Sequence, residues 1–366
     1  MTDESRGERL AALAVEAGLG MVLVGDLVRP GDSGADAMAN IRWLTGFTGT
    51  SGMALVGGGR REFLTDFRYT ERATSEVASE FDRVTLEGRL LKELAKRLEG
   101  RVGYDEDATS VSSFRRLTEA IPEGAELVPA NGFVEKLRRQ KEAKEIEAIA
   151  EASRLADEVF EWLAESGLAG RTEREVAQAA QARMRELGAE PSFPAIVGSG
   201  PNGAQPHSEP GERQIGQGEL VVVDIGAQLD GYCSDGTRTF ATGEVDAEAR
   251  EVYVLVLRSQ EASLDAVRAG LSGAEADKVS RDPIEAAGKG DLYGHGLGHG
   301  VGMEVHEAPR LGKTSEDVLG VGDVVTVEPG VYVPGRFGVR IEDLVVVEES
   351  GIRNLSSTPK ALRTVA

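Results

Sequence analysis

The sequence predicts two domains, an α/β domain followed by a larger α+β domain. Over about the first 130 residues, runs typical of strands alternate with runs typical of helices, which is the pattern of a small α/β domain. Near residue 133 the pattern changes to long helices, and from residue 191 onward it changes to glycine-rich strands. The length of 366 residues suits two domains, which we place at residues 1–132 and 133–366.

The first domain follows from short apolar runs separated by turn residues. Runs such as MVLVG are typical of buried strands, and clusters of Gly, Pro and Asp mark the connections. In chain order we expect a helix at 8–20, a strand at 21–25, a loop at 26–37, two strands within 51–66, helices near 70–80 and 88–99, a strand within 101–107, and a helix at 110–120.

The second domain begins with helices. Residues 133–167 are dense in helix-forming residues at helical spacing, and their first part is charged enough to be a linker helix. Residues 172–188 open with a capping box, in which Thr172 is followed three residues later by Glu175. From residue 191 onward we expect mainly strands.

Charge and composition exclude several classes of protein. The formal net charge is −21, from 62 acidic and 41 basic residues, whereas a nucleic-acid surface needs a basic footprint. The single cysteine, Cys233, excludes an internal disulfide. The polar N-terminus does not resemble a signal peptide, and no apolar run approaches the ~18 residues of a membrane span. We therefore expect a cytoplasmic protein without nucleic-acid or membrane partners.

An internal repeat links two parts of the second domain. GQGELVVVDIG at residues 216–226 aligns without a gap with GVGDVVTVEPG at residues 320–330. Two strands that follow tight turns can look alike, which is the simpler explanation. We favour a duplicated unit, which would place Asp224 and Glu328 at equivalent positions in two halves of one domain.

Each repeat leads into a second strand that carries another carboxylate. A two-residue loop at Leu229–Asp230 would place Asp224 directly opposite Asp235. A turn near PGRFG would place Glu328 roughly opposite Glu342. Most Asp and Glu side chains face solvent, so each pair alone has an ordinary explanation. Two pairs beside a histidine cluster instead predict a cation site, because close buried carboxylates repel one another.

The histidines support this interpretation. Three of the 4 histidines lie within GHGLGHGVGMEVHE, residues 294–307. Four carboxylates and one imidazole form a suitable shell for two divalent cations ~3.5–4 Å apart. Carboxylates suit Mn²⁺, and imidazole extends the choice to Co²⁺, Zn²⁺ and Fe²⁺. We expect two divalent metal ions, with Mn²⁺ first and the other three left open.

These motifs resemble those of the pita-bread metallopeptidases, the family of methionine aminopeptidase, aminopeptidase P and prolidase. The matching segments, within about residues 135–360, are DIGAQLDGYCSD, GHGLGHGVGMEVHE, VEPGVYV and GVRIED. NIRWLTGFTGTSG (40–52) and FLTDFRYTERA (63–73) resemble the N-terminal domain of the Xaa-Pro peptidases and creatinase. Methionine aminopeptidases lack that domain, and creatinase lacks the carboxylate shell. The resemblance therefore implies a creatinase-like α/β domain, a pita-bread α+β domain and an Xaa-Pro peptidase.

The resemblance also implies metal ligands and a catalytic base. The ligands would be Asp224, Asp235, His299, Glu328 and Glu342, with Asp235 and Glu342 bridging the two ions. Glu328 would act as the general base beside a metal-bound water, whose pKa a metal lowers to about 7.

The other histidines would contact or support the substrate. By resemblance, His207 and His306 would be catalytic, contacting the scissile carbonyl and the tetrahedral intermediate. A hydrogen-bond donor at such a position is worth roughly 2.7–4 kcal/mol. His295 would have a supporting role near the pocket.

Two arginines are weaker candidates for substrate binding. Arg310 would pair with a substrate carboxylate and so favour dipeptides, and the alternative is a solvated surface arginine. Arg340 lies on the same strand face as Glu342. It would stabilise a bridging carboxylate or touch substrate, and an ordinary strand-face arginine is an equal alternative.

We expect a dinuclear metallo-exopeptidase that hydrolyses the bond before proline in small proline-containing peptides. This reaction releases the N-terminal residue. A prolidase restricted to dipeptides is the first alternative, and a non-catalytic pita-bread binding protein is the second. The X–Pro bond is a tertiary amide without an N–H group, so a dedicated pocket must accept the proline ring. Members of this family are often homodimers, and we expect a homodimer here.

Overall fold

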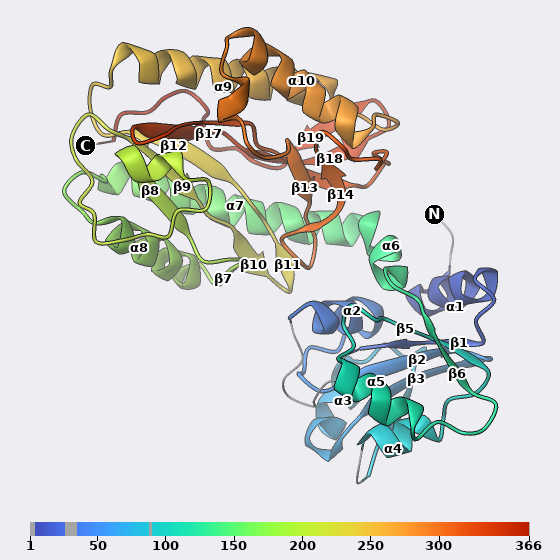
Figure 1. Cartoon of the computed structure of the whole chain (residues 1–366). Coiled ribbons are helices and arrows are strands. Elements are labelled where there is room, and N and C mark those ends of the chain that lie inside the picture. The colour runs from blue at the N-terminus through green and yellow to red at the C-terminus, as the bar shows by residue number, and fades with distance from the viewer. Residues whose placement is uncertain (1–3, 26–34, 88–89, 366) are drawn as a thin grey trace. The chain divides into compact units, whose positions relative to one another are not determined.

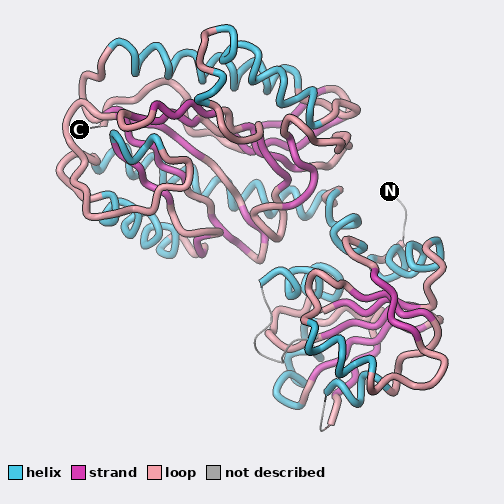
Figure 2. Tube along the Cα trace, viewed as in Figure 1, coloured by secondary structure: helices cyan, strands magenta, loops and turns pink. Residues whose placement is uncertain are grey.

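A computed structural model describes residues 4–25, 35–87 and 90–365 of the chain. By their internal contacts, these residues form two units, Met1–Arg138 and Arg139–Ala366 (Figure 1). Both units contain helices and strands, which the colours of Figure 2 distinguish.

The two units divide between Arg138 and Arg139, six residues further along the chain than the boundary after residue 132 that the sequence suggested. Helix α6 (Phe133–Arg139) accounts for the difference. Its Arg138 donates a 2.6 Å hydrogen bond to Asn40, and Asn40 donates a 2.5 Å hydrogen bond to Glu135. These bonds attach most of α6 to the first unit.

The first unit contains a mixed six-stranded sheet with the strand order β4-β3-β2-β1-β5-β6. Its central strands are short apolar runs, and every residue of β1 and β2 is buried. The strands are β1 (Met21–Val24), β2 (Met53–Gly57), β3 (Arg60–Thr65), β4 (Asp82–Thr85), β5 (Arg101–Tyr104) and β6 (Glu126–Pro129). The helices are α1 (Arg6–Glu16), α2 (Ala35–Thr45), α3 (Thr70–Glu76), α4 (Leu90–Ala95) and α5 (Val111–Thr118), with a 3₁₀ turn, η1 (Phe67–Tyr69).

The expected elements of this unit are confirmed with shifted ends, and three further elements were not expected. The three are α2, β4 and β6. Strands β4 and β6 form the two edges of the sheet and have no buried residue, so they lack the apolar run that marks a strand. Most of the loop expected at residues 26–37 lies outside the described residues, and its last three residues belong to α2.

The second unit packs helices on both sides of curved strands. In Figure 1, α7 and α8 lie on one side of the strands, and α9 and α10 lie on the other. The helices are α7 (Ala143–Ser166), α8 (Glu173–Glu186), α9 (Ala247–Ala266) and α10 (Gly273–Ala286), with 3₁₀ turns η2 (Gly200–Ala204) and η3 (Gly290–Leu292). The strands are β7 (Glu190–Pro191), β8 (Ile196–Ser199), β9 (Leu220–Asp224), β10 (Ala227–Leu229), β11 (Tyr232–Cys233), β12 (Thr237–Ala241), β13 (Gly298–Gly300), β14 (Glu307–Leu311), β15 (Val324–Val327), β16 (Gly330–Val333), β17 (Phe337–Arg340), β18 (Asp343–Glu348) and β19 (Gly351–Asn354).

Helices α9 and α10 contradict the expectation of mainly strands after residue 191. Helix α9 contains the run VYVLVL at residues 252–257, whose β-branched residues favour a strand in isolation. Helix α10 contains Pro283, which disfavours a helix interior. Packing therefore overrides local preference, because Val252, Tyr253 and Val256 are buried in one apolar cluster of this unit.

The internal repeat corresponds to a duplicated structural unit. Helices α7 and α8 precede strand β9, and helices α9 and α10 precede strand β15. Helix α8 begins with the expected capping box of Thr172 and Glu175, and α10 begins with an equivalent box of Ser272 and Glu275.

The turns before the two central strands also make the same hydrogen bonds. In both copies, a glycine N–H at the start of the repeat binds an acidic side chain three residues later. A second glycine N–H binds a main-chain oxygen in, or directly after, the strand that pairs with the central strand, which is β12 in the first copy and β18 in the second. The first bonds are Gly216 to Glu219 (3.0 Å) and Gly320 to Asp323 (2.8 Å), and the second are Gly218 to Thr242 (3.2 Å) and Gly322 to Val347 (2.9 Å). The prediction of a duplicated unit is therefore confirmed.

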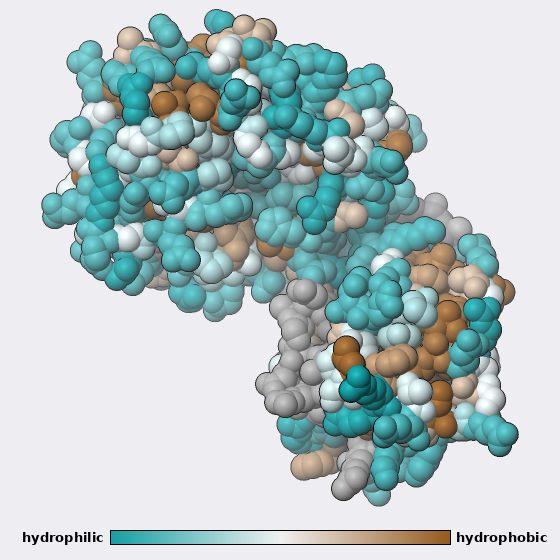
Figure 3. Space-filling view, in the orientation of Figure 1, coloured by the Kyte–Doolittle hydropathy of each residue, from teal (hydrophilic) through white to brown (hydrophobic). Residues whose placement is uncertain are grey.

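The visible face of the second unit carries mainly polar side chains, as Figure 3 shows, in agreement with the net charge of −21. Within the described ranges, none of the helices combines the length and apolar character that a bilayer crossing requires.

Candidate active site

Three acidic side chains from different strand ends meet inside the second unit. Asp224 ends β9, Asp235 precedes β12, and Glu342 lies between β17 and β18. One oxygen of each lies within 4.8 Å of the others. Their residues are only 8%, 7% and 2% exposed, respectively. The sequence-predicted carboxylates thus form a buried cluster.

The register of the first hairpin differs from the prediction. Asp224 pairs with Thr237 and not with Asp235. The loop consists of Asp230 and Gly231, both with positive φ (49° and 82°), as a two-residue hairpin turn requires. The loop therefore lies one residue later than expected, and the partner of Asp224 shifts by two. Because strand side chains alternate with a period of two, Asp235 stays on the same face as a diagonal neighbour.

The register of the second hairpin agrees with the prediction. Val327 pairs with Asp343, and Gly330 pairs with Arg340. Both pairs share one register, which places Glu328 opposite Glu342.

His299 brings an imidazole to the carboxylate cluster. Its Nε2 lies 3.3 Å from Glu328 Oε1 and 3.6 Å from Asp235 Oδ2. Its Nδ1 lies 3.1 Å from the carbonyl oxygen of Gly300, which can only accept a hydrogen bond. A proton on Nδ1 would therefore leave the Nε2 lone pair directed at the cluster, which is the usual arrangement of a metal-ligating histidine.

The electrostatics of the cluster call for a cation. Burial, followed by the charges of neighbouring carboxylates, raises the pKa of Asp235 and of Glu342 well above the ordinary range. Burial also raises the pKa of Asp224. Asp224 Oδ1 is buried and makes no hydrogen bond within the part of the chain that the structure describes. An oxygen left in this way beside two further carboxylates fits a divalent metal ion.

Glu328 differs from the other carboxylates because it contacts His299. Burial opposes its ionisation, but the hydrogen bond with His299 and the nearby positive charges lower the pKa of Glu328 to about 2. Conversely, burial alone would lower the pKa of His299, and the hydrogen bond and charge of Glu328 raise it. The contact therefore favours the protonated form of His299 together with the ionised form of Glu328.

Arg340 is a member of the cluster. It is 4% exposed, and its Nη2 donates a 2.5 Å hydrogen bond to Asp224 Oδ2. Its Nε donates to the Thr237 hydroxyl at 3.0 Å, and that hydroxyl donates to Glu342 at 2.7 Å. Arg340 is therefore not an ordinary strand-face arginine, because it holds two of the clustered carboxylates in place.

His295 and Tyr332 extend this network. The Tyr332 hydroxyl lies 2.9 Å from His295 Nε2 and 2.9 Å from Arg340 Nη1. Burial lowers the pKa of His295, which favours the neutral imidazole. Sequence reasoning did not identify Thr237, although it lies only two residues after the predicted ligand Asp235.

All the sequence-predicted site residues line one pocket of about 640 Å³. His306 lies beside His299, with 4.4 Å between ring centroids. Arg310 is exposed at this pocket, and within the described ranges its guanidinium has no hydrogen-bond or ion-pair partner. The full set is Asp224, Asp235, His207, His295, His299, His306, Arg310, Glu328, Arg340 and Glu342.

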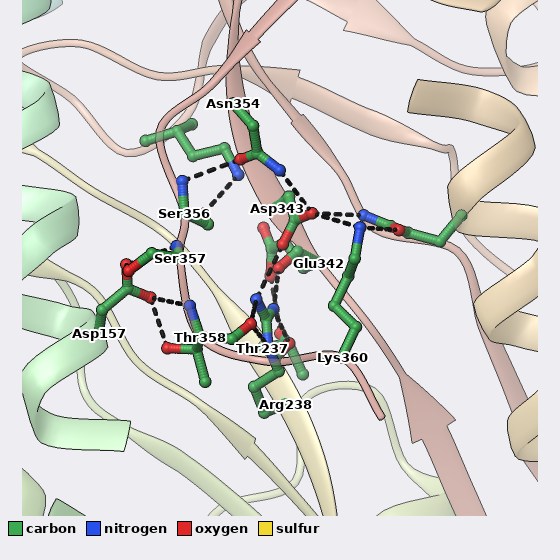
Figure 4. Close-up of polar contacts among 12 residues, drawn as sticks. Asp157, Thr237, Arg238, Glu342, Asp343, Asn354, Ser356, Ser357, Thr358 and Lys360 are labelled. Atoms are coloured by element: carbon green, nitrogen blue, oxygen red, sulfur yellow. Dashed lines mark hydrogen bonds and ion pairs between the residues drawn. The ribbon is translucent and has the colours of Figure 1, made fainter. Parts of the chain in front are cut away.

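A second polar network lies behind Glu342, on the side away from the pocket (Figure 4). Arg238 donates to the main-chain oxygen of Glu342 and forms a 2.9 Å ion pair with Asp343. Asp343 also accepts hydrogen bonds from Lys360 (2.9 Å) and Asn354 (2.9 Å). Thr237 and Glu342 therefore face the pocket, while the residues that follow them, Arg238 and Asp343, face away.

Helix α7 anchors the C-terminal segment to this network. Asp157 accepts hydrogen bonds from the N–H and hydroxyl groups of Ser357 and Thr358, at 2.5–3.1 Å. The carbonyl oxygen of Thr358 accepts in turn from Arg238 at 2.6 Å. Residues 357–358 thus link α7 to Arg238, which in turn bonds the main chain of Glu342.

Comparison with known proteins identifies the class. Residues 147–349 match metallopeptidase family M24, and residues 6–140 match the creatinase/prolidase N-terminal domain. The chain therefore belongs to metallopeptidase family M24, which confirms the expected creatinase-like first domain and pita-bread second domain.

Individual relatives are similar over almost the whole chain. The peptidase YqhT of Bacillus subtilis, which is described as uncharacterized, is 40% identical over 342 residues, covering 91% of this chain and 96% of that protein. The structure of an Xaa-Pro dipeptidase from Bacillus anthracis is 39% identical with a TM-score of 0.93, covering 98% of this chain and 99% of that one. The structure of an X-Pro aminopeptidase from Thermotoga maritima is 33% identical with a TM-score of 0.89, covering 99% of this chain and 100% of that one.

Proposed function

We propose that this chain is a metal-dependent exopeptidase that hydrolyses the Xaa-Pro bond of small peptides and releases their N-terminal residue. The observation that carries the proposal is the buried cluster of Asp224, Asp235 and Glu342, in which burial and mutual repulsion raise the carboxyl pKa values and Asp224 Oδ1 has no hydrogen-bond partner among the described residues. The names of the Bacillus anthracis and Thermotoga maritima relatives support the Xaa-Pro bond as the target.

Five side chains would hold two divalent metal ions: Asp224, Asp235, His299, Glu328 and Glu342. Bound divalent ions supply Lewis-acid polarisation of the scissile carbonyl and a water of lowered pKa. We propose Mn²⁺ as the native metal, because carboxylates dominate the donor set, with Co²⁺, Zn²⁺ and Fe²⁺ as alternatives.

The side chains around the carboxylates would carry the proton transfers and the substrate contacts. Glu328 is ionised at neutral pH, so its carboxylate can accept a proton from the attacking water. His207 and His306 would donate hydrogen bonds to the carbonyl oxygen as negative charge develops there. Arg340 also donates to the carbonyl oxygen of Pro206 at 3.3 Å, which couples the segment carrying His207 to the metal ligands.

Substrate length separates the two forms of this activity. As the main proposal, the enzyme is an aminopeptidase that accepts peptides longer than two residues. Arg310 favours the alternative, a dipeptidase, if its guanidinium binds the carboxylate of a substrate that ends in proline. A homodimer is a further part of the proposal and rests on the family resemblance. A cytoplasmic location is another part, which rests on the sequence, because a single cysteine suits a reducing compartment.

The test is an assay of chelator-stripped protein with and without added Mn²⁺. We expect metal-dependent hydrolysis of Ala-Pro-Ala. We also expect a preference for peptides that have proline as their second residue. Hydrolysis confined to Ala-Pro would make the enzyme a dipeptidase. Full activity without metal would overturn the metal-dependent mechanism, and absence of hydrolysis with metal bound would overturn the Xaa-Pro assignment.

A further inference from the structure

A second cavity adjoins the pocket of the carboxylate cluster. Its volume is about 790 Å³, larger than the 640 Å³ of the active-site pocket. The two cavities share four lining residues: His295, Gly296, Arg310 and Gly312. The proposed catalytic roles leave this second cavity without a function.

Arg281 fixes the main chain between the two cavities. Its guanidinium is bound to Asp277 at 2.8 and 2.9 Å. It also donates to the carbonyl oxygens of Tyr293 (2.9 Å) and His295 (2.7 Å). The Arg281 residue itself is only 5% exposed. Buried hydrogen bonds therefore fix the main chain of residues 293–295, which lies between the cavities.

Arg310 projects from strand β14 at the border of the cavities, and the turn that follows the strand is bonded to the main chain of Arg310. Its N–H donates to Asp317 at 2.8 Å, and its carbonyl oxygen accepts from Ser315 at 2.6 Å. Lys313 lines the second cavity but not the active-site pocket. Among the described residues, neither Arg310 nor Lys313 forms an ion pair through its side chain. Acidic residues, including Glu316, line the same cavity. This mixed charge suits a peptide chain with a terminal carboxylate better than a polyanion.

Gly294 keeps the second cavity open. It lines the second cavity and not the active-site pocket. A Cβ atom at this position would meet no atom within 4 Å, and its φ lies outside the left-handed region. Of the described glycines with such open surroundings, every other one has a positive φ. Neither the backbone conformation nor close packing requires glycine at position 294. The effect of glycine here is therefore to leave space in the second cavity.

We propose that the second cavity binds the residues that follow proline in peptides of three or more residues. This inference rests on the proposed function, because it assumes that proline occupies the active-site pocket. The substrate would pass Arg310 and continue over Gly296 and Gly312. An extended chain advances about 3.3–3.6 Å per residue. The cavity volume also lies within the ~300–1,000 Å³ that is usual for ligand sites, so it has room for several residues.

The two cations would then divide their roles by substrate length. The carboxylate of a dipeptide would end at Arg310. In a longer peptide, Arg310 would donate to a main-chain carbonyl, and the terminal carboxylate of a short extension would lie near Lys313.

The test compares Ala-Pro with Ala-Pro-Ala-Ala-Ala on the Mn²⁺-loaded full chain and on a Gly294→Phe variant. The added ring would occupy the second cavity. We expect the ratio of kcat/KM for the pentapeptide over the dipeptide to fall about tenfold or more, equivalent to ~1.4 kcal/mol. The matched control is Ala286→Phe, which adds the same ring at an exposed position of α10 that lines neither cavity, and it should leave this ratio unchanged.

The outcomes separate this inference from the proposed function. An equal effect of Gly294→Phe on both substrates, or wild-type hydrolysis of Ala-Pro alone, would overturn the inference and leave the Xaa-Pro activity standing. Absence of hydrolysis of every Xaa-Pro peptide by the loaded wild-type chain would overturn both.

A second variant covers the case in which Gly294→Phe does not fold. Lys313→Gln should weaken binding of Ala-Pro-Ala, seen as a raised KM, more than binding of its C-terminal amide. An equal change in KM for the acid and the amide would contradict a carboxylate contact in the second cavity.

Discussion

His299 and His306 lie side by side but differ in their surroundings. His299 lies beside two carboxylates, those of Glu328 and Asp235, and can direct Nε2 at them, whereas His306 is an exposed residue of the same pocket. Burial and the charge of His299 lower the pKa of His306, so His306 is neutral at neutral pH. Two histidines of one motif are thus suited to different tasks, metal ligation and hydrogen bonding to substrate.

Substitution of each histidine by alanine should separate these tasks. We expect His299→Ala to lose both bound metal and hydrolysis, because a ligand is removed. His306→Ala should keep the metal and lose about 10²–10³ in kcat, the usual effect of removing a donor to a developing oxyanion. Metal content by elemental analysis, measured beside kcat, distinguishes the two. Loss of metal in His306→Ala would mean that the ligand histidine is misassigned.

Arg340 provides a second test at the same scale. Replacement by Gln removes the partner of buried Asp224, and breaking a buried ion pair costs about 3–5 kcal/mol. We expect a loss of this size in the free energy of unfolding of metal-free protein, measured by urea denaturation. Arg353→Gln is the control, because Arg353 forms an exposed 3.4 Å pair with Glu348 that is worth about 0–1 kcal/mol. Similar losses in both variants would contradict the role given to Arg340.

At the scale of elements, strand β18 and the preceding residue Glu342 connect the pocket to the network behind it. Alternation along the chain places Glu342 toward the metal ligands and Asp343 toward Arg238 and Lys360. Burial opposes ionisation of Asp343, yet the charges of Arg238 and Lys360 lower its pKa. A change at Asp343 should therefore reach the metal site without touching it.

Asp343→Asn tests this coupling. The variant leaves Arg238 and Lys360 without their shared carboxylate, so we expect weaker metal binding and a lower free energy of unfolding. Metal affinity is measured by competition with a chromophoric chelator, and unfolding is measured by urea denaturation. Glu348→Gln, an exposed change on the same strand, is the control. Unchanged metal affinity in Asp343→Asn would show that the rear network stabilises the fold alone.

At the scale of the whole molecule, the clustered carboxylates make stability depend on metal and pH together. Asp235 and Glu342 have folded-state pKa values above their unfolded values, because burial and mutual repulsion disfavour their charged forms. Their contribution to stability is therefore fully present below pH ~4, the unfolded carboxyl pKa, and is lost as the pH rises through the folded pKa. A bound cation offsets this loss.

The difference in Tm between metal-loaded and chelator-stripped protein should therefore widen as the pH rises from 5 to 8. Thermal unfolding of both forms across this range measures it, and groups outside the site cancel in the difference. A constant difference would contradict the raised pKa values of Asp235 and Glu342. The same scan on Glu348→Gln, which lies outside the pocket, controls for general charge effects.

The sequence by itself determined the motifs that carry the chemistry. The spacing of His295, His299 and His306 and the paired carboxylates on repeated strands indicated a cation site, and the family resemblance of these motifs supplied the ligand set and the expected roles of His207 and His306. The duplicated unit was also visible, because its turns conserve the same glycine and acidic positions. The strand register of the first hairpin was predicted less accurately. Its loop lies at Asp230–Gly231, so Asp224 pairs with Thr237 and not with Asp235, although Asp224 and Asp235 still share one face of the hairpin.

Only the tertiary structure decided the features that depend on contacts between distant segments. Helix α9 forms because its valines are buried against distant strands, although its local sequence favours a strand. The network that joins Asp157, Arg238 and Lys360 behind the site spans more than 200 residues of chain, and no local pattern marks it. The second cavity likewise exists because Gly294, Arg310 and Lys313 meet in space. Local patterns fix the residue types and the faces of strands, whereas burial, pairing and cavities arise from packing alone.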